Sequence, residues 1–278
     1  MLTNAQVGLN RITYPKLGLG QFFALAARVG ASSVELRNDL AGGELADGLA
    51  PDEVRSLAER HHIQISALNA LQKFNLPERL NSCQQELAAM ARVARSIGCG
   101  AIVLCPNNDK SDKRTAVEAG RDTVLALKAL RPVLEDAGVT GYVEALGFPE
   151  SSLKSVFVAA QAIGEAGGGC YKIVYDTFHH YLGPDTPEEI ENSLDVSTIG
   201  IVHASGVEVP VDKGSLRDEH RLLITAKDRL GTLVQLAILT SLGYTGVVSL
   251  ECFSPQLQQM DQRAFVKTAR TCIQLLTK

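Results

Sequence analysis

Short apolar runs alternate with longer amphipathic stretches along the whole chain. Eight of these runs are rich in Val, Ile, Leu or Ala, and most are continuously apolar rather than alternating. Continuous runs of this kind are typical of parallel β-strands that are covered on both faces. The predicted strands span residues 7–10, 33–37, 64–69, 101–105, 141–144, 171–176, 198–203 and 247–251.

Between the runs, apolar residues recur at the three- and four-residue spacing of amphipathic helices. The clearest pattern covers 77–97, where Leu80, Leu87 and Ile97 share one stripe and Arg92 lies off it. The other predicted helices span residues 51–61, 115–137, 153–166, 231–242 and 262–277. Glycines follow several helices and precede the next run, as C-cap residues do: Gly98, Gly138, Gly243 and residues 167–169.

Eight strands and intervening helices in strict order predict an α/β fold, a closed (β/α)8 TIM barrel. The length of 278 residues suits such a barrel, so residues 1–278 are expected to form a single domain. The alternative is an open doubly wound sheet, but no GxGxxG or Walker-type loop follows the first run. The long segment 204–228 has no clear pattern, and loops of that length are often functional.

Composition narrows the class of protein. The net charge is −4 and no basic patch is present, which argues against nucleic acid as a partner. No run approaches the roughly 18 apolar residues that span a bilayer, and the first residues do not resemble a signal peptide. The six cysteines form no CxxC pair and are expected to be reduced thiols of a cytoplasmic protein. Barrels of this kind often dimerise, so a homodimer is a candidate assembly.

Four consecutive predicted strands end on a metal-capable side chain after an apolar run. These residues are Glu144, Asp176, His203 and Glu251. In a barrel, the carboxyl ends of the strands meet at one mouth, where active sites lie. A single glutamate at a strand end is more often a surface or capping group, but four on adjacent strands are expected to converge.

Charge repulsion makes a metal the simplest explanation of such a cluster. Three buried carboxylates would repel one another, and each costs several kcal/mol unless it is paired or coordinated. One divalent cation removes that cost, and His203 adds a nitrogen ligand. This donor set suits Mn²⁺, Co²⁺, Zn²⁺ or Mg²⁺ and leaves the choice among them open.

Several stretches resemble the xylose-isomerase-like barrel superfamily of sugar isomerases, epimerases and endonuclease IV. Within it, the chain most resembles the inosose (2-keto-myo-inositol) isomerases of inositol catabolism. The similar stretches are HHIQISALNAL at 61–71 with Phe74-Asn75, VEALGFP at 143–149, DTFH at 176–179 and LECFSP at 250–255. Their order and spacing carry the likeness over nearly the whole chain.

The resemblance implies roles for individual residues. It implies that the four strand-end residues bind the metal, that His179 lines the substrate site, and that Arg221 of the DEHR segment contacts substrate oxygens. Related proteins often carry a Pro-Gly-x-Gly turn after this arginine. Here residues 222–231 read LLITAKDRLG, a different and slightly longer loop, which leaves the substrate open.

The activity expected from this likeness is isomerisation of a hydroxy-ketone polyol, an inosose or a ketose. Proton transfer next to the carbonyl would pass through a cis-enediolate whose charge the cation stabilises. Glu144 and Glu251 are the expected catalytic pair, because the matching pair serves superfamily epimerases in this way. Strand-end positions make Asn10, Glu35, Arg37 and Asn69 further candidates for substrate contact. Phe74, Phe148 and Phe253 are candidates for either the pocket wall or the core.

Two alternatives stay open at this point, and a third is disfavoured. An inosose dehydratase or a ketose 3-epimerase would use the same scaffold and metal. An endonuclease IV-like activity would need more histidines than six and a basic surface. A non-catalytic sugar-binding barrel would also fit the fold, since fold alone does not fix function.

Overall fold

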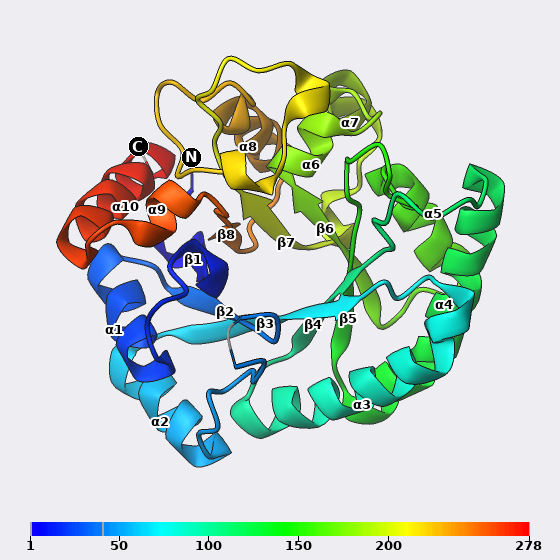
Figure 1. Cartoon of the computed structure of the whole chain (residues 1–278), viewed down its shortest axis with the longest axis horizontal. Coiled ribbons are helices and arrows are strands. Elements are labelled where there is room, and N and C mark those ends of the chain that lie inside the picture. Colours follow the sequence, from blue (N-terminus) through cyan, green and yellow to red (C-terminus); the bar gives the residue numbers. More distant parts are fainter. Residues whose placement is uncertain (1, 41, 278) are drawn as a thin grey trace.

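An eight-stranded barrel forms the centre of the molecule, and helices surround it (Figure 1). The computed structural model describes residues 2–40 and 42–277. The strands are β1 Val7–Asn10, β2 Ser33–Arg37, β3 Gln64–Gln72, β4 Ala101–Cys105, β5 Thr140–Glu144, β6 Tyr171–Asp176, β7 Ile199–Ala204 and β8 Val248–Leu250. All neighbours pair in parallel, and β1 also pairs with β8. The predicted closed (β/α)8 barrel is therefore confirmed.

The helices lie outside the strands. They are α1 Leu19–Val29, α2 Pro51–His61, α3 Leu80–Ile97, α4 Ala116–Ala137, α5 Val156–Glu165, α6 Thr177–Leu182, α7 Pro187–Ser193, α8 Thr232–Ser241, α9 Pro255–Gln259 and α10 Gln262–Leu276. Within the described ranges, none of them has both the length and the apolar character needed to cross a membrane.

All eight predicted strands and all six predicted helices are present, and some of them end at other residues than predicted. Strand β3 runs three residues further than predicted, and β8 is shorter. Helix α1 is missing from the predicted set, although Leu19, Phe22, Phe23 and Ala26 have helical spacing and are buried. Helices α6, α7 and α9 have five to seven residues, which is too short for a periodic pattern to reveal them.

The two faces of each strand have different environments. Outward residues such as Val34, Leu36 and Val202 pack against the helices in one large apolar core. Inward residues alternate with them, and those deep in the barrel form a separate small cluster that includes Ala67 and Val103. Towards the carboxyl ends of the strands the inward side chains become polar. A layer of buried polar side chains therefore separates the apolar interior of the barrel from its mouth.

The segment after β7 folds back over this end of the barrel. Gly206 and Leu222 exchange two backbone hydrogen bonds of 2.7 Å, which form an isolated antiparallel bridge. Asp228 then accepts a hydrogen bond from the backbone N–H of Val207 at 2.9 Å. This pairing returns Arg221, the residue before the bridge, to the mouth of the barrel.

Candidate metal centre

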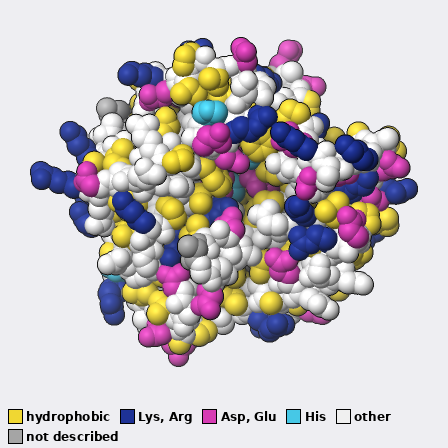
Figure 2. Space-filling view, viewed as in Figure 1, with side chains coloured by type: hydrophobic (Ala, Val, Ile, Leu, Met, Phe, Trp, Pro, Cys, Tyr) yellow, Lys and Arg dark blue, Asp and Glu magenta, His cyan; other side chains and the backbone are white. Residues whose placement is uncertain are grey.

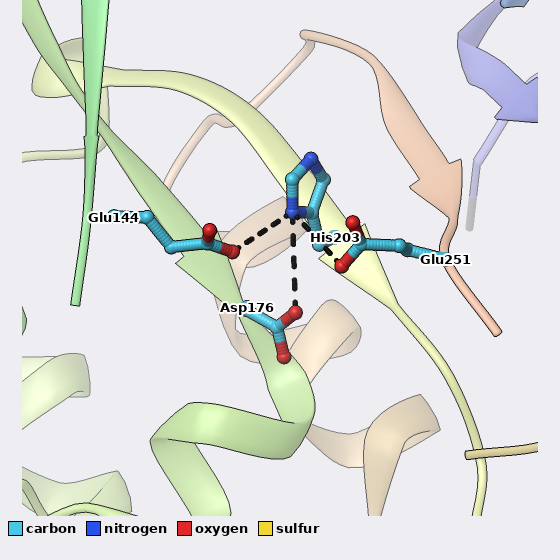
Figure 3. A group of neighbouring side chains, drawn as sticks. All are labelled: Glu144, Asp176, His203 and Glu251. Carbon is cyan, nitrogen blue, oxygen red and sulfur yellow. Dashed lines mark hydrogen bonds and ion pairs between the residues drawn. The ribbon is translucent and has the colours of Figure 1, made fainter. Parts of the chain in front are cut away.

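Four metal-capable side chains converge at the carboxyl-terminal mouth. Glu144 ends β5, Asp176 ends β6, His203 lies one residue before the end of β7, and Glu251 directly follows β8. Each offers one ligand atom, and these atoms lie within 4.8 Å of one another. All four residues are buried, with at most 4% of their surface exposed. Figure 3 shows the side chains reaching one point from separate strands.

His203 Nδ1 lies at the centre of this group. It is 3.0 Å from Glu144 Oε1, 3.4 Å from Glu251 Oε2 and 3.9 Å from Asp176 Oδ2. Burial alone lowers the pKa of His203, but the carboxylates, Glu251 and Glu35 foremost, raise that pKa well above its ordinary value. The carboxylates around His203 therefore favour a positive charge at the centre of the group.

Two arginines contact the carboxylates. Arg221 Nη2 lies 2.6 Å from Asp176 Oδ2 and 2.9 Å from Glu251 Oε2. Arg37 Nη1 lies 2.8 Å from Glu251 Oε1. Burial alone would raise the pKa of Glu251, but His203 and the two arginines lower it to about 2. Glu251 is therefore an ionised carboxylate at neutral pH.

The balance of buried charge fits a divalent cation. Four buried carboxylates, those of the ligand group and of Glu35, face the two buried guanidinium groups of Arg37 and Arg221. Two negative charges remain when His203 is neutral, and uncompensated buried charge is costly. Oxygen and imidazole donors are the ligands that Mn²⁺, Co²⁺, Zn²⁺ and Mg²⁺ accept. The residues present therefore fit the metal that the sequence predicts.

A cavity of about 250 Å³ opens beside the ligand group. Figure 2 shows a hollow near the centre of this view, with acidic and basic side chains around it. The lining includes Arg37, Asn69, Cys105, Glu144, Phe148, His179, Asp218, Arg221, Glu251 and Phe253. The ring of Phe253 lies 5.3 Å from the Arg37 guanidinium and 4.9 Å from that of Arg221. Phe74, in contrast, is fully buried in the apolar core.

Helix α6 places one of its two histidines in the cavity wall. Asp176 caps this helix, because its Oδ1 accepts hydrogen bonds from the backbone N–H groups of Phe178 and His179. The ring of His179 packs edge-on against Phe148, with 5.0 Å between ring centroids. His180 instead packs on Tyr175, whose side chain lies on the outward face of β6. The cap thus couples the position of His179 to that of a candidate metal ligand.

Gly147 permits the close approach between α6 and the loop after β5. A Cβ at this position would lie 2.7 Å from Leu182 Cβ and 2.8 Å from the Gly183 backbone nitrogen, and would clash with the His179 carbonyl oxygen. We expect Gly147→Ala to lower the free energy of unfolding by about 1–3 kcal/mol, as overpacking does. Denaturant unfolding measures this effect.

The matched control is Gly120→Ala in α4, where an added Cβ meets nothing within 4 Å. It should stabilise the protein by about 0.5–1 kcal/mol, because alanine loses less conformational freedom in a helix. Equal effects of the two substitutions would contradict the proposed contact.

Asn10 and Glu35 are placed differently from the substrate contacts that the sequence predicts. Both are fully buried, and neither is among the residues that line the cavity. Asn10 Nδ2 donates to Glu35 Oε1 at 3.2 Å and to Glu251 Oε1 at 3.1 Å, while Glu35 contacts His203. Both side chains therefore hold other residues of the site. Asn69 and Arg37 do line the cavity.

Cys105 is a site residue that the sequence does not single out. It ends β4, lines the cavity, and its thiol donates a hydrogen bond of 3.2 Å to Glu144 Oε2. Burial and then the Glu144 charge raise the pKa of this thiol well above its ordinary value, so it stays protonated and can donate. Its place at the end of an apolar strand is the signal that could have identified it.

Loss of this thiol should weaken metal binding modestly. Cys105→Ala removes one donor from Glu144, worth about 1 kcal/mol, which corresponds to roughly fivefold in affinity. Cys105→Ser keeps a donor and should stay near the wild type. Zinc titration against a chelator measures both, with Cys99→Ala, a buried thiol that contacts the Ala101 carbonyl, as the control. Equal affinity of Cys105→Ala and the wild type would contradict a role for the thiol.

Comparisons of the sequence with a family model and with curated proteins agree on one family. The sequence model of the xylose isomerase-like TIM barrel matches residues 23–271. An inosose isomerase of Halalkalibacterium halodurans is 28% identical over 231 residues, covering 82% of this chain and 80% of the relative. An inosose isomerase of Bacillus velezensis is 26% identical over 264 residues, covering 93% of this chain and 91% of the relative.

Solved structures agree on the fold. A xylose isomerase domain containing protein from Salmonella typhimurium LT2 has a TM-score of 0.92 and 34% identity, covering 100% of this chain and 99% of that one. The IolI protein with a bound zinc atom has a TM-score of 0.88 and 24% identity, covering 98% of both chains. The chain therefore belongs to the xylose isomerase-like TIM barrel family.

Proposed function

We propose that this protein is a divalent-metal-dependent isomerase of a hydroxy-ketone polyol, with an inosose as the first candidate substrate. The observation that carries the proposal is the meeting of Glu144, Asp176, His203 and Glu251 within 4.8 Å, beside a cavity lined by polar and aromatic side chains. The curated relatives named inosose isomerase support the choice of substrate.

The four converging side chains would hold the cation. When bound, a divalent cation supplies a Lewis acid that stabilises negative charge on substrate oxygens. The donor set accepts Mn²⁺, Co²⁺, Zn²⁺ or Mg²⁺. Zinc is the first candidate, because the IolI protein of the same fold holds a zinc atom.

Glu144 and Glu251 would transfer the protons. They extend from β5 and β8 and approach the centre from opposite sides (Figure 3). One carboxylate would remove the proton from the hydroxyl-bearing carbon. The other, after taking up a proton from solvent, would deliver it to the adjacent carbon, while the hydroxyl proton passes to the former carbonyl oxygen. Arg37 and Arg221 hold Glu251 as an oriented carboxylate, whereas Glu144 accepts from the Cys105 thiol. The two glutamates thus have different partners, which suits two different steps.

The cavity wall would orient the substrate. His179, Asn69 and Arg37 present polar groups to the cavity, and Phe148 and Phe253 present apolar surface. A ring polyol has hydroxyl groups around its edge and less polar faces, so this mixture of side chains matches it. The small size of the cavity also favours one monocyclic molecule over a polymer.

Product analysis tests the proposal. The zinc- or manganese-loaded protein is incubated in D2O with scyllo-inosose and, separately, with ketohexoses, and the products are assigned by NMR. We expect an isomeric inosose that has gained deuterium from solvent, and no such product from metal-stripped protein. A dehydrated product or an epimeric ketose would point to the dehydratase or the 3-epimerase instead. The absence of both turnover and deuterium exchange with all of these ketones would contradict an enzymatic role.

A further inference from the structure

A fully buried carboxylate, that of Glu35, lies beneath the candidate metal centre. Glu35 belongs to β2 and is 0% exposed, and its Oε2 lies 3.0 Å from His203 Nε2. The opposite ring nitrogen of His203, Nδ1, faces Glu144, Asp176 and Glu251. His203 therefore bridges the buried carboxylate on one side and the ligand group on the other.

The hydrogen bonds around Glu35 place an acceptor oxygen beside Nε2 of His203. Asn10 Nδ2 donates to Glu35 Oε1 at 3.2 Å, and Asn69 Nδ2 donates to Glu35 Oε2 at 2.7 Å. Both amides donate, so the oxygens of Glu35 serve as acceptors here, and Oε2 lies where a ring N–H on His203 Nε2 can donate to it. Nδ1 is then the nitrogen whose lone pair is left for a cation.

The barrel register builds this arrangement. Asn10 pairs with Glu35 between β1 and β2, which brings the amide beside the carboxylate. One layer deeper, Ser33 and Gly8 are paired in the same way, and a Cβ at Gly8 would lie 2.8 Å from Ser33 Oγ. Burial of a carboxylate here is costly, and the donors from Asn10, Asn69 and His203 compensate for it. A carboxylate buried at this cost, directly beneath the candidate metal centre, indicates that Glu35 has a role in that centre.

We propose that Glu35 is a positioning residue that fixes the ring orientation and the tautomer of His203, so that Nδ1 is presented to the metal. The proposal rests on the proposed metal centre. Carboxylates that accept a hydrogen bond from a ligating histidine orient the ring and typically contribute 10- to 100-fold to metal affinity. Glu35 would act through His203 and would not touch the substrate.

The experiment compares metal affinity and histidine NMR signals in the full-length protein. Zinc affinity is measured by competition with a chelator for the wild type, Glu35→Gln and Ser33→Ala. The control Ser33→Ala changes a buried side chain on the same strand whose hydroxyl has no hydrogen-bond partner among the described residues. We expect Glu35→Gln to bind zinc about 10- to 100-fold more weakly, and Ser33→Ala to bind as the wild type does.

NMR of protein labelled with ¹⁵N-histidine identifies the ring nitrogens. The His203 signals are assigned by their loss in His203→Asn. In the zinc-loaded wild type, we expect Nδ1 to be metal-bound and Nε2 to carry a proton, and Glu35→Gln should alter both signals. This measurement needs no Glu35 variant, so the proposal can fail even if Glu35→Gln does not fold.

Two results would overturn the role of Glu35 alone. One is a zinc-loaded wild type in which Nε2 is the bound nitrogen. The other is a folded Glu35→Gln protein with unchanged zinc affinity and unchanged His203 signals. If the wild type bound no divalent metal, the metal centre itself would be wrong and the role of Glu35 would fall with it.

Discussion

Replacing Glu144 or Glu251 by glutamine is expected to lower kcat by about 10²- to 10⁴-fold, the usual contribution of general acid–base catalysis. Glutamine has nearly the same size but neither accepts nor delivers a proton under these conditions. The two substitutions should lower the free energy of unfolding by different amounts. Glu251 accepts from Asn10, Arg37 and Arg221, so Glu251→Gln leaves buried donors poorly paired. Glu144→Gln loses fewer such partners and should unfold closer to the wild type.

Turnover, bound metal and denaturant unfolding are measured on the same preparations. Glu191→Gln, at an exposed position of α7, is the matched control and should change none of the three. Bound metal is needed to separate a lost proton-transfer group from a lost ligand. Near-normal turnover in either glutamine variant would show that the pair does not move the protons.

Arg221→Met is expected to lower the free energy of unfolding of the metal-free protein by about 3–5 kcal/mol. Arg221 is 1% exposed, and its Nη2 joins the carboxylates of Asp176 and Glu251. Removing this cation leaves buried negative charges without compensation. A metal ion bound by the same carboxylates should restore part of the loss, because ligands that bind only the folded state stabilise it.

Urea unfolding with EDTA and with saturating zinc measures this difference. Arg217→Met is the control, since the Arg217 side chain is partly exposed and donates to the backbone carbonyls of Gly214 and Leu216. Zinc should reduce the difference in free energy of unfolding between Arg221→Met and the wild type. It should leave the corresponding difference for Arg217→Met unchanged. An Arg221→Met protein as stable as the wild type in EDTA would contradict the charge balance described above.

The fold could be predicted because the barrel repeats one physical pattern eight times. Each strand is buried on both faces and reads as an apolar run, and each long helix has an apolar stripe. The sequence pattern does not predict every end of a strand or helix. Strand β3 continues to Gln72 because Leu71 and Gln72 still pair with β4, which composition alone does not show. Short helices such as α6 depend on a cap, here Asp176, rather than on periodicity.

The part of the site that could be predicted is the set of residues at the carboxyl ends of the strands. The convergence of Glu144, Asp176, His203 and Glu251 follows from four adjacent strands that end on polar residues. The depth of each side chain does not follow, because it depends on strand stagger around the barrel. For this reason Glu35 is predicted to contact substrate, yet the structure places it beneath His203.

A crystal structure of the protein saturated with zinc or manganese, with the ion located by its anomalous scattering, tests the metal centre. We predict one ion in contact with Glu144, Asp176, His203 Nδ1 and Glu251, at distances of about 2.0–2.4 Å. The same side chains surrounding only water in the saturated crystal, or an ion held elsewhere, would contradict the metal centre and the chemistry built on it.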